Sequence, residues 1–516
     1  MTRDLETLVA RTLDVLVVGG GITGLAVAYD AAQRGLAVGL IDRGDFGNAA
    51  TLPHLPLVSG DVQRPSLAAG QDRARRTLAR MAPHALQPVA CVVPIYRSFR
   101  HGALVTRSTL AARGILRPGR AGDLPPSLRL PGARVVSRGH AIQHFPGLRR
   151  QRLTGAAVSY DYLAPEPDRL VFAFALAAAE HGAAVANYVE ALAPLVDGTR
   201  VVGVRARDLV SGRTFEIGAR MTINATGPAI DALLTPLGVP TGIPMRERLS
   251  LVTTRDAGDE VLAGVAGARR LFLVPWRRRA LFGPWYGDPD VSAFITHLNQ
   301  AFPALDLSLK DVTLVHRAVA PAAGGDRAMD HSAGGAQGII SAIAASTVSA
   351  RALAERVTDL ALQKLGHAVV PCRTAETVLP GGSLRDAGAA VGEARREYDT
   401  GLPSDAIPHL LVAFGSRYRD VLHLTADRPD WRPGVAPGCP VIGAELVHAA
   451  RTEMVTTLAD AVVRRTALGA LDEPAADVLG RVAAIVGVEL GWAEERQRAE
   501  IAAVRTLYGT LKALNT

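Results

Sequence analysis

The segment LDVLVVGGGITGLAVAYDAAQRGLAVGLIDRG, residues 13–44, constrains the fold of this chain more than any other stretch. Asp14 leads a short apolar run that predicts a buried strand, and the run ends in the turn Gly19-Gly20-Gly21-Ile22-Thr23-Gly24. Apolar residues at helical spacing follow as far as Gly35, and a second apolar run ends at Asp42. This order of strand, turn, helix and strand predicts the first unit of a Rossmann-like α/β domain.

The glycines of the turn have separate physical roles in binding a dinucleotide. Gly19 allows the tight turn, Gly21 lets the backbone approach a pyrophosphate, and Gly24 lets the helix pack closely on the strand. Asp42 lies where a carboxylate can accept hydrogen bonds from a ribose 2′-hydroxyl, which disfavours a 2′-phosphorylated cofactor. The remaining residues expected to contact the cofactor here are Ile22, Thr23 and Arg43.

The segment 181–231 favours FAD over NAD. It reads as a helix end, a strand, a meander of three apolar strands and a final strand that ends at Ala225-Thr226-Gly227. We expect this small-residue turn to lie against a cofactor phosphate or ribose, and we expect Val189 to offer its backbone to an adenine. Such a distant return to the first sheet is typical of flavoproteins whose FAD domain is interrupted by insertions.

Composition sets the class of protein and the partners to be expected. The 516 residues suffice for two or three domains, and 48% hydrophobic with 21% charged residues predicts a folded chain. The net charge of +8 includes the arginine runs 73–80 and 275–280. Because neither run alternates with aromatic residues, we expect a solvated helix face and an exposed hairpin, and no nucleic-acid partner.

The spacing of the cysteines and the absence of long apolar runs indicate the cellular compartment of the protein. Cys91, Cys372 and Cys439 are far apart and have no metal-binding spacing, which indicates a reducing compartment. The opening MTRDLETLVARTLD has acidic residues throughout and no central apolar run, and no apolar stretch reaches about 18 residues. We expect a cytoplasmic protein; peripheral contact with the inner face of a membrane stays an alternative.

Several further motifs identify a family. Besides residues 14–46, they are MAPHALQPV (81–89), SYDYLAPEPDRLVFAFALAAAEHGA (159–183), INATGPAID (223–231), LFLVPWRRRALFG (271–283), CRTAETVLPGG (372–382), FGSRYRDVL (414–422), ELVHAARTEMVTTLADAVVRRTALG (445–469) and GWAEERQRAEI (491–501). With these motifs the chain resembles the FAD-dependent glycerol-3-phosphate dehydrogenases through most of its length.

The resemblance implies a three-part architecture. A discontinuous Rossmann-like FAD-binding domain would comprise residues 1–88, 154–240 and 326–366, and a mixed α+β substrate domain would comprise residues 89–153 and 241–325. An all-helical cap would occupy residues 384–516, where we expect Arg464 and Arg465 to be structural.

The chain departs from the family in the loop that follows the fingerprint, DFGNAATLPHLPLVSGD (45–61). In the family this loop is small, polar and basic, and it holds flavin and substrate. Here the family's serines, arginine and lysine fall on Leu52, Pro53, His54 and Pro56, and its histidine falls on Ser59. The polar residues that remain as flavin contacts are Asn48 and Thr51.

Two other departures also remove positive charge. The family's substrate arginine matches Ala320, and its Gly-Gly-Lys turn matches Ala344, Ala345 and Ser346. A buried phosphate needs arginine or lysine partners, because its desolvation without them is very costly. We therefore expect FAD binding to be kept and the substrate to differ from glycerol 3-phosphate.

Oxidation of an alcohol or amine by FAD requires few protein groups: one that takes the heteroatom's proton, and positive charge near flavin N1 and O2. The helix that starts after AASTVS can supply the charge through its N-terminus, with Ser346 and Thr347. For the proton we consider His316 and Arg317, of which strand alternation lets only one face the pocket. The other catalytic candidates are His54 and Arg327.

Three functions stay open. The first is a dehydrogenase or oxidase acting on a CH–OH or CH–NH bond of another small-molecule substrate, with O2, a quinone or another redox partner as the electron acceptor. The second is the family's own reaction with a quinone acceptor, its phosphate site rebuilt from Arg64, Arg246 or Arg317. The third is a flavin-binding homologue without catalysis. A homodimer is an open alternative in each case.

Overall fold

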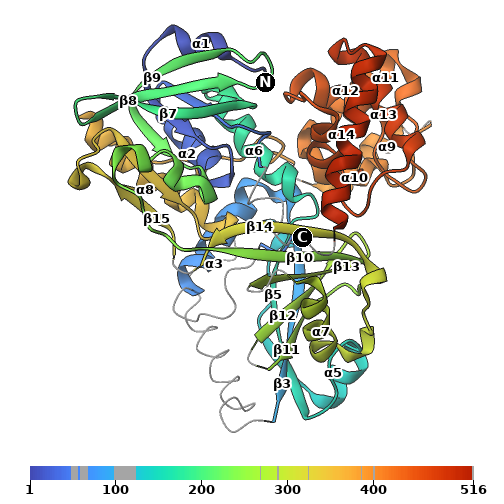
Figure 1. Ribbon diagram of the computed structural model, residues 1–516. Helices are drawn as coiled ribbons and strands as arrows, with labels where there is room; N and C mark the ends of the chain where they lie inside the picture. The colour runs from blue at the N-terminus through green and yellow to red at the C-terminus, as the bar shows by residue number, and fades with distance from the viewer. Residues whose placement is uncertain are drawn as a thin grey trace.

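The computed structural model describes residues 1–47, 56–58, 68–97, 124–267, 269–286, 290–322, 325–384, 386–398 and 401–513. Two β-sheets and a helical C-terminal region make up the molecule (Figure 1). The first sheet and the helical region lie side by side in the upper half of that view, and the second sheet lies below them.

The first sheet has the strand order β15-β16-β9-β1-β2-β6, with β8 and β7 continuing from β9. β1 is parallel to both β2 and β9, and β16 is parallel to β9, as the strand–helix–strand pattern predicts. The strands are β1 (Leu13–Val18), β2 (Val38–Ile41), β6 (Ala184–Ala186), β7 (Val189–Asp197), β8 (Arg200–Asp208), β9 (Thr214–Asn224), β15 (Arg327–Asp330) and β16 (Ile339–Ile343).

One detail of the meander differs from the prediction. The third strand of the meander and the strand that ends at Ala225 are one continuous element, β9 (Thr214–Asn224). Its first half pairs with β8 and its second half with β1, so a single long strand serves two neighbours.

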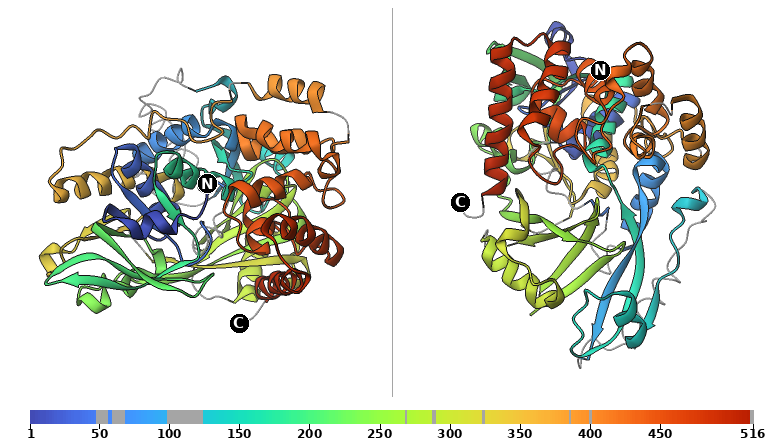
Figure 2. Two further views of the ribbon diagram at one scale, coloured as in Figure 1. Left: turned by 90° about the horizontal axis from the view of Figure 1, so that it is seen from above. Right: turned by 90° about the vertical axis from the view of Figure 1, so that its right-hand side faces the viewer.

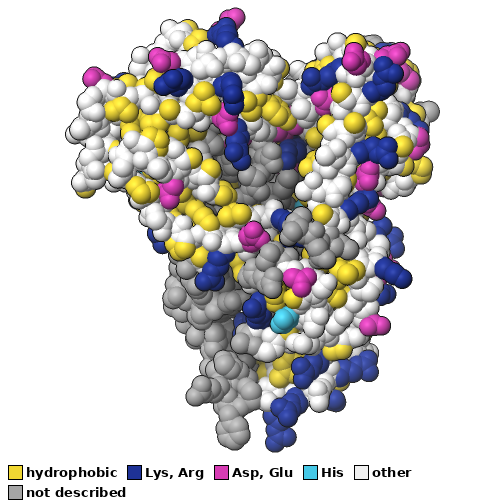
Figure 3. Space-filling model, in the orientation of Figure 1, with side chains coloured by type: hydrophobic (Ala, Val, Ile, Leu, Met, Phe, Trp, Pro, Cys, Tyr) yellow, Lys and Arg dark blue, Asp and Glu magenta, His cyan; other side chains and the backbone are white. Residues whose placement is uncertain are grey.

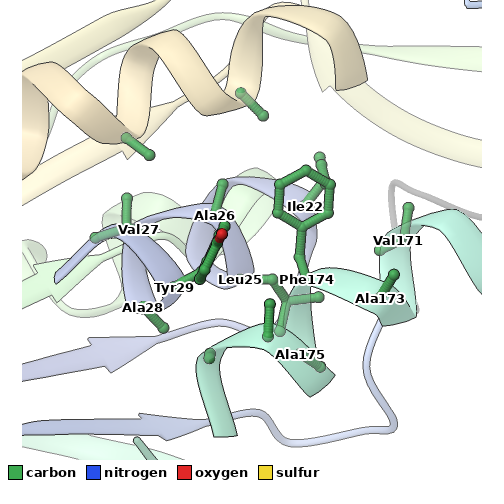
Figure 4. Close-up of a cluster of buried hydrophobic side chains, with 14 of the residues drawn as sticks. Ile22, Leu25, Ala26, Val27, Ala28, Tyr29, Val171, Ala173, Phe174 and Ala175 are labelled. Atoms are coloured by element: carbon green, nitrogen blue, oxygen red, sulfur yellow. The ribbon is translucent and has the colours of Figure 1, made fainter. Parts of the chain in front are cut away.

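The helix after the fingerprint is buried between two other helices. Figure 4 shows α2 (Ile22–Gln33) between α6 (Pro167–Glu180) and α8 (Thr347–Leu365), where alanines allow close approach and larger side chains fill the gaps. Tyr29 of α2 meets Phe174 of α6 edge to face, with their ring centroids 6.3 Å apart. This packing holds the first turn of α2 at the edge of the sheet. The other helices of this region are α1 (Leu5–Ala10) and α3 (Ala68–Met81).

The second sheet has the order β14-β10-β13-β12-β11-β3-β5-β4 and is antiparallel except where β11 meets β3. Its strands are β3 (Gln87–Tyr96), β4 (Arg134–Ser137), β5 (Leu153–Leu163), β10 (Met245–Asp256), β11 (Val261–Ala266), β12 (Arg269–Trp276), β13 (Arg279–Tyr286) and β14 (Val312–Pro321). We expected the FAD-binding domain to resume at residue 154, but β5 pairs with β3 and β4 as far as Leu163. By strand pairing, the transition between the two sheets falls after β5.

The two faces of the second sheet contact different neighbours. Leu249 and Val315 pack on one face with α7 (Val291–Ala301), close to α5 (Arg138–His144). Val252 of β10 and Leu314 of β14 point to the opposite side and pack on the other face with the C-terminal helices. Alternate residues of β10 and β14 therefore face opposite sides of the sheet.

The C-terminal region consists of helices. They are α9 (Ala387–Tyr398), α10 (Ala406–Phe414), α11 (Tyr418–Asp427), α12 (Gly443–Thr452), a π-helix over Asp460–Arg465, α13 (Ala476–Leu490) and α14 (Glu494–Lys512). Figure 2 (right) shows α14 running down this region and ending beside the second sheet. We call this region the cap.

Short 3₁₀ helices connect these elements. They are η2 (Pro83–Ala85), η4 (Pro126–Leu128), η5 (Gly227–Ala232), η6 (Thr235–Leu237), η7 (Pro303–Leu305), η8 (Leu309–Asp311), η9 (Ser332–Gly334), η10 (Gly415–Arg417) and η11 (Pro429–Trp431).

Two features of the structure are relevant to contact with a membrane: the exposed apolar side chains and the length and apolar character of the helices. Figure 3 shows apolar side chains at the surface over the first sheet. On β7, Leu192 is 43% and Val196 is 49% exposed. Scattered exposed apolar residues are ordinary on folded proteins. Among the described residues, none of the helices combines the length and the apolar character needed to cross a bilayer. Location in the cytoplasm and contact with a membrane surface stay predictions.

Candidate cofactor and active site

Those predicted cofactor residues that the structure describes lie at one edge of the first sheet. Because β1, β2, β9 and β16 are parallel, their carboxyl ends meet there. These ends lead into the fingerprint turn, Asp42-Arg43, Ala225–Gly227 and Ala344–Thr347. The backbone N–H of Ala344 donates to the Thr23 hydroxyl at 3.3 Å, which joins two of these segments directly.

The fingerprint turn is too crowded for any side chain at two of its glycines. Gly19 has φ +111°, and a Cβ placed there would lie 2.4 Å from the Ala225 carbonyl oxygen. A Cβ at Gly24 would lie 1.8 Å from the Gly19 carbonyl oxygen. The turn therefore depends on glycine at both positions.

The N-terminus of α2 suits a pyrophosphate. Gly21 is the N-cap residue, and none of the described side chains caps the helix there. The N–H groups of Ile22 and Thr23 belong to the first turn, so they have no partner within the helix. Donors of this kind at a helix N-terminus attract anions, and the arrangement fits a dinucleotide such as FAD.

Asp42 is fixed beside this turn. Its Oδ2 accepts from the Gly20 N–H at 2.6 Å and its Oδ1 from the Gly44 N–H at 2.7 Å. Burial raises the pKa of Asp42 to about 6, although the two amide hydrogen bonds act in the opposite direction. Each carboxylate oxygen keeps further lone pairs for a ribose hydroxyl. Arg43, next to it, is exposed.

The segment around Val189 runs alongside Asp42. The Val189 N–H donates to the Asp42 carbonyl at 2.7 Å, and the Asp42 N–H donates to the Ala186 carbonyl at 3.1 Å. The Val189 N–H thus has an internal partner in this structure. Its contact with an adenine stays a prediction.

The turn Ala225–Gly227 is held by an asparagine that we had not singled out. The Thr226 hydroxyl donates to Asn224 Oδ1 at 2.7 Å, and Asn224 Nδ2 donates to the Ile230 carbonyl at 2.7 Å. Gly227 has φ +59°, which favours glycine. Asn224 belongs to the INATGPAID motif (223–231). Membership of that motif is the sequence signal that could have identified Asn224.

The N-terminus of α8 already has an internal anion. Ser346 caps it by accepting from the Ser349 N–H at 3.2 Å. Asp326 Oδ1 accepts from the Ala345 N–H at 2.8 Å and from the Ser349 hydroxyl at 2.6 Å. The positive end of α8, which begins at Thr347, is therefore shared with a carboxylate that the sequence did not single out.

His316 and Arg317 lie on opposite faces of β14. His316 stands across from Ser250, on the face that Val252 and Leu314 share with the cap. Burial lowers the pKa of His316 to about 4, so its ring is neutral near physiological pH. Arg317 is on the other side, with one Nη 3.5 Å from the Ala513 carbonyl beyond the end of α14. A role for either residue as proton acceptor stays a prediction.

The other catalytic candidates are Arg327 and His54. Arg327 is exposed on β15, across from Ile343, and so belongs to the first sheet. His54, with the flavin-loop residues Asn48 and Thr51, lies outside the described residues.

Two arginines of β10 stand opposite the alanines of β14. Arg246 pairs with Ala320, the position of the family's substrate arginine, and Arg248 pairs with Ala318. Residues that pair in an antiparallel ladder share a face, so both arginines lie on the face of His316. Arg246 is exposed; Arg248 is only 7% exposed, and burial lowers its pKa. The sequence singled out Arg246 but gave no signal for Arg248.

Comparisons with known proteins agree with this geometry. Residues 14–356 match the family model described as FAD dependent oxidoreductase, and residues 372–497 match the one described as the C-terminal domain of alpha-glycerophosphate oxidase. A glycerol-3-phosphate dehydrogenase of Synechocystis is 26% identical over 540 residues, covering 96% of each chain. The mitochondrial glycerol-3-phosphate dehydrogenase of Homo sapiens is 25% identical over 555 residues, covering 95% of this chain and 72% of that protein.

Solved structures share the fold. The glycerol-3-phosphate dehydrogenase from Bacillus halodurans, complexed with FAD, matches with a TM-score of 0.77 and 22% identity over 99% of this chain and 97% of that one. L-proline dehydrogenase from P. horikoshii matches with a TM-score of 0.53 and 16% identity over 70% of this chain and 96% of that one. The predicted resemblance and the α/β fold with a helical C-terminal region are confirmed.

Proposed function

The chain belongs to the FAD-dependent oxidoreductase family, and from that premise we propose that it oxidises the CH–OH or CH–NH bond of a small carboxylate rather than glycerol 3-phosphate. Its cofactor is FAD, and an oxidoreductase of this family requires a substrate and an electron acceptor. FAD, when bound, accepts a hydride from the substrate carbon at N5.

The register of β10 against β14 carries this proposal. Position 320 has no positive charge, while Arg246 and Arg248 stand across from Ala320 and Ala318 on the face of His316. A planar guanidinium pairs well with a carboxylate through two parallel hydrogen bonds. A phosphate dianion carries more charge to be desolvated than a carboxylate does.

The remaining roles are part of the proposal. The first-turn N–H groups of Ile22 and Thr23 would hold the pyrophosphate of FAD, and Asp42 would accept a hydrogen bond from its ribose. His316 receives the proton from the oxygen or nitrogen of the substrate as the carbon loses its hydride. Its lowered pKa keeps the ring in the accepting form.

Glycerol 3-phosphate is the second candidate substrate. The relatives named above are called glycerol-3-phosphate dehydrogenases and cover nearly the whole chain. Arg246 and Arg248 together would then replace the missing positive charge at Ala320. Transfer of the electrons to O2, a quinone or another redox partner fits either substrate.

Anaerobic flavin reduction by matched substrates tests the proposal. The FAD-loaded protein is mixed with glycerate, lactate, serine, proline, glycerol and glycerol 3-phosphate, and the loss of flavin absorbance is followed. We expect reduction by at least one of the carboxylates and none by glycerol 3-phosphate at the same concentration. Reduction by glycerol 3-phosphate alone would establish the second candidate instead.

A further inference from the structure

A fully buried ion pair joins the cap to the FAD-binding part of the chain. Arg465, at the end of the π-helix, donates from one Nη to Asp45 Oδ2 at 2.6 Å and from the other to Asp45 Oδ1 at 2.8 Å. Both side chains are 1% exposed. The guanidinium also lies over the Phe172 ring, 3.9 Å from its centroid, and its Nε donates to the Glu453 carbonyl at 3.0 Å. Arg465 is therefore held in one orientation.

The residues that follow Asp45 touch the fingerprint turn. The Gly47 N–H donates to the Gly20 carbonyl at 2.9 Å. Phe46 packs so closely on Gly20 that a Cβ there would lie 2.5 Å from the Phe46 ring. Gly20 in turn donates to Asp42. A continuous path of contacts thus runs from Arg465 through residues 45–47 to the turn and to Asp42.

The cap also contacts Asn187 and Tyr188, which lie beside Asp45. Asn187 Nδ2 donates to Asp45 Oδ1 and to the Met454 carbonyl, each at 3.0 Å. The Tyr188 hydroxyl donates to Asp460 Oδ1 at 2.6 Å. Asn187 and Tyr188 directly precede Val189, so the cap segment 453–465 contacts both segments that flank the predicted adenosine half of the cofactor site.

We propose that Arg465 is a positioning residue for FAD, through which the cap sets the affinity of the nucleotide site. The proposal rests on the proposed function only in that FAD occupies the turn at Gly19–Gly24. Removal of Arg465 leaves Asp45 as a buried charge without its main partner, and residues 45–47 relax to bring water to it. The fingerprint turn, which packs on residues 46 and 47, and Asp42, which is bonded to that turn, then lose the geometry that the cofactor requires.

The test compares FAD affinity between Arg465→Met and a matched control in the full-length protein. The control is Arg417→Met, because Arg417 also joins the cap to the FAD-binding part, through Glu180 at 2.9 Å, but on the exposed surface. FAD is removed, and its dissociation constant is measured by quenching of flavin fluorescence. We expect Arg465→Met to raise the constant at least about fivefold and Arg417→Met to leave it within about twofold of the wild type.

A double-mutant cycle tests whether Asp45 and Arg465 act on FAD affinity through their mutual contact. Asp45→Asn should raise the constant as Arg465→Met does, and the double variant should lose no more than the worse single variant, because both act through one contact. If Arg465→Met does not fold, Asp45→Asn and Tyr188→Phe carry the same test with smaller changes. FAD affinity equal to that of the wild type in folded Arg465→Met or Asp45→Asn would overturn the proposal.

The two proposals fail in different ways. A wild-type protein that binds FAD but is reduced by no substrate contradicts the proposed function and leaves the role of Arg465 to be read from the affinities. Unchanged affinities in the variants of a protein that is reduced by substrate contradict the role of Arg465 alone.

Discussion

Arg246 of β10 lies directly across from Ala320 of β14 in the antiparallel ladder. In the family that the chain resembles, the arginine that matches Ala320 holds substrate, so positive charge here has moved to the neighbouring strand. Arg248, two residues further, is buried on the same face. On the proposed function, the guanidinium groups that bind substrate therefore start from β10 rather than from β14.

Arg248→Met should weaken substrate binding more than it slows the reaction. Loss of a charged hydrogen-bond donor raises KM for an anionic substrate by about 10- to 100-fold, whereas kcat changes little because the reacting atoms are elsewhere. Steady-state kinetics of the variant are compared with Arg255→Met, a change to a partly exposed arginine of the same strand that pairs with Asp311. Equal KM values in the two variants would remove Arg248 from the site.

His316→Gln should lower kcat by about 100- to 10,000-fold while FAD content stays unchanged, because the proton acceptor is lost and the cofactor turn is not touched. Since burial lowers the pKa of His316 to about 4, the wild-type kcat/KM should show no titration of this residue above about pH 5. A pH–rate profile of both proteins checks this. Unaltered kcat in the variant would exclude His316 as the base.

Gly24→Ala should abolish FAD loading. The added methyl group would lie 1.8 Å from the Gly19 carbonyl oxygen, so the turn must open and the helix must shift. We expect a loss of about 1–3 kcal/mol in the free energy of unfolding as well as colourless protein. Gly480→Ala is the control, because its Cβ would meet open space on α13. A yellow Gly24→Ala protein would mean that the turn does not bind the cofactor.

His84 should make the protein sensitive to acid. It borders a cavity of about 480 Å³ between α6 and the cap, where burial and the nearby charge of Arg169 lower its pKa to about 4. Because the unfolded chain binds a proton at this histidine near pH 6.5, its contribution is present above that pH and is lost as the pH falls to about 4, by up to about 3 kcal/mol.

Denaturant unfolding of wild type and His84→Gln between these pH values measures the effect, with the exposed His140→Gln as control. The stability of His84→Gln should fall less steeply with acid than that of the other two proteins. Parallel curves for all three would show that His84 does not contribute.

The sequence predicts local features well because their causes are local. The turn from Gly19 to Gly24 and the placement of Asp42 follow from steric rules over about 20 residues, and the structure has them as expected. The alternation of side chains along a strand also predicted that His316 and Arg317 would lie on opposite faces of β14. The pairing of β5 with β3 could not be predicted, because the apolar run of β5 gives no sign of which sheet it joins.

Features that depend on distant partners could not be predicted. Asp45 and Arg465 are 420 positions apart, and neither carries a local mark of a buried pair. Arg248 became a candidate site residue only through its register with β14, and the contact of Asp326 with the N-terminus of α8 depends on the position of that helix. Tertiary packing decides these contacts, and a single sequence does not encode them in any nearby pattern.

The visible spectrum of the FAD-loaded protein, before and after anaerobic addition of glycerol 3-phosphate, tests the central claim most directly. The account predicts flavin bands that do not bleach with glycerol 3-phosphate but bleach when a suitable hydroxy- or aminocarboxylate is added to the same sample. Complete bleaching by glycerol 3-phosphate would contradict the account, because it would show that Arg246 and Arg248 rebuild the family's phosphate site.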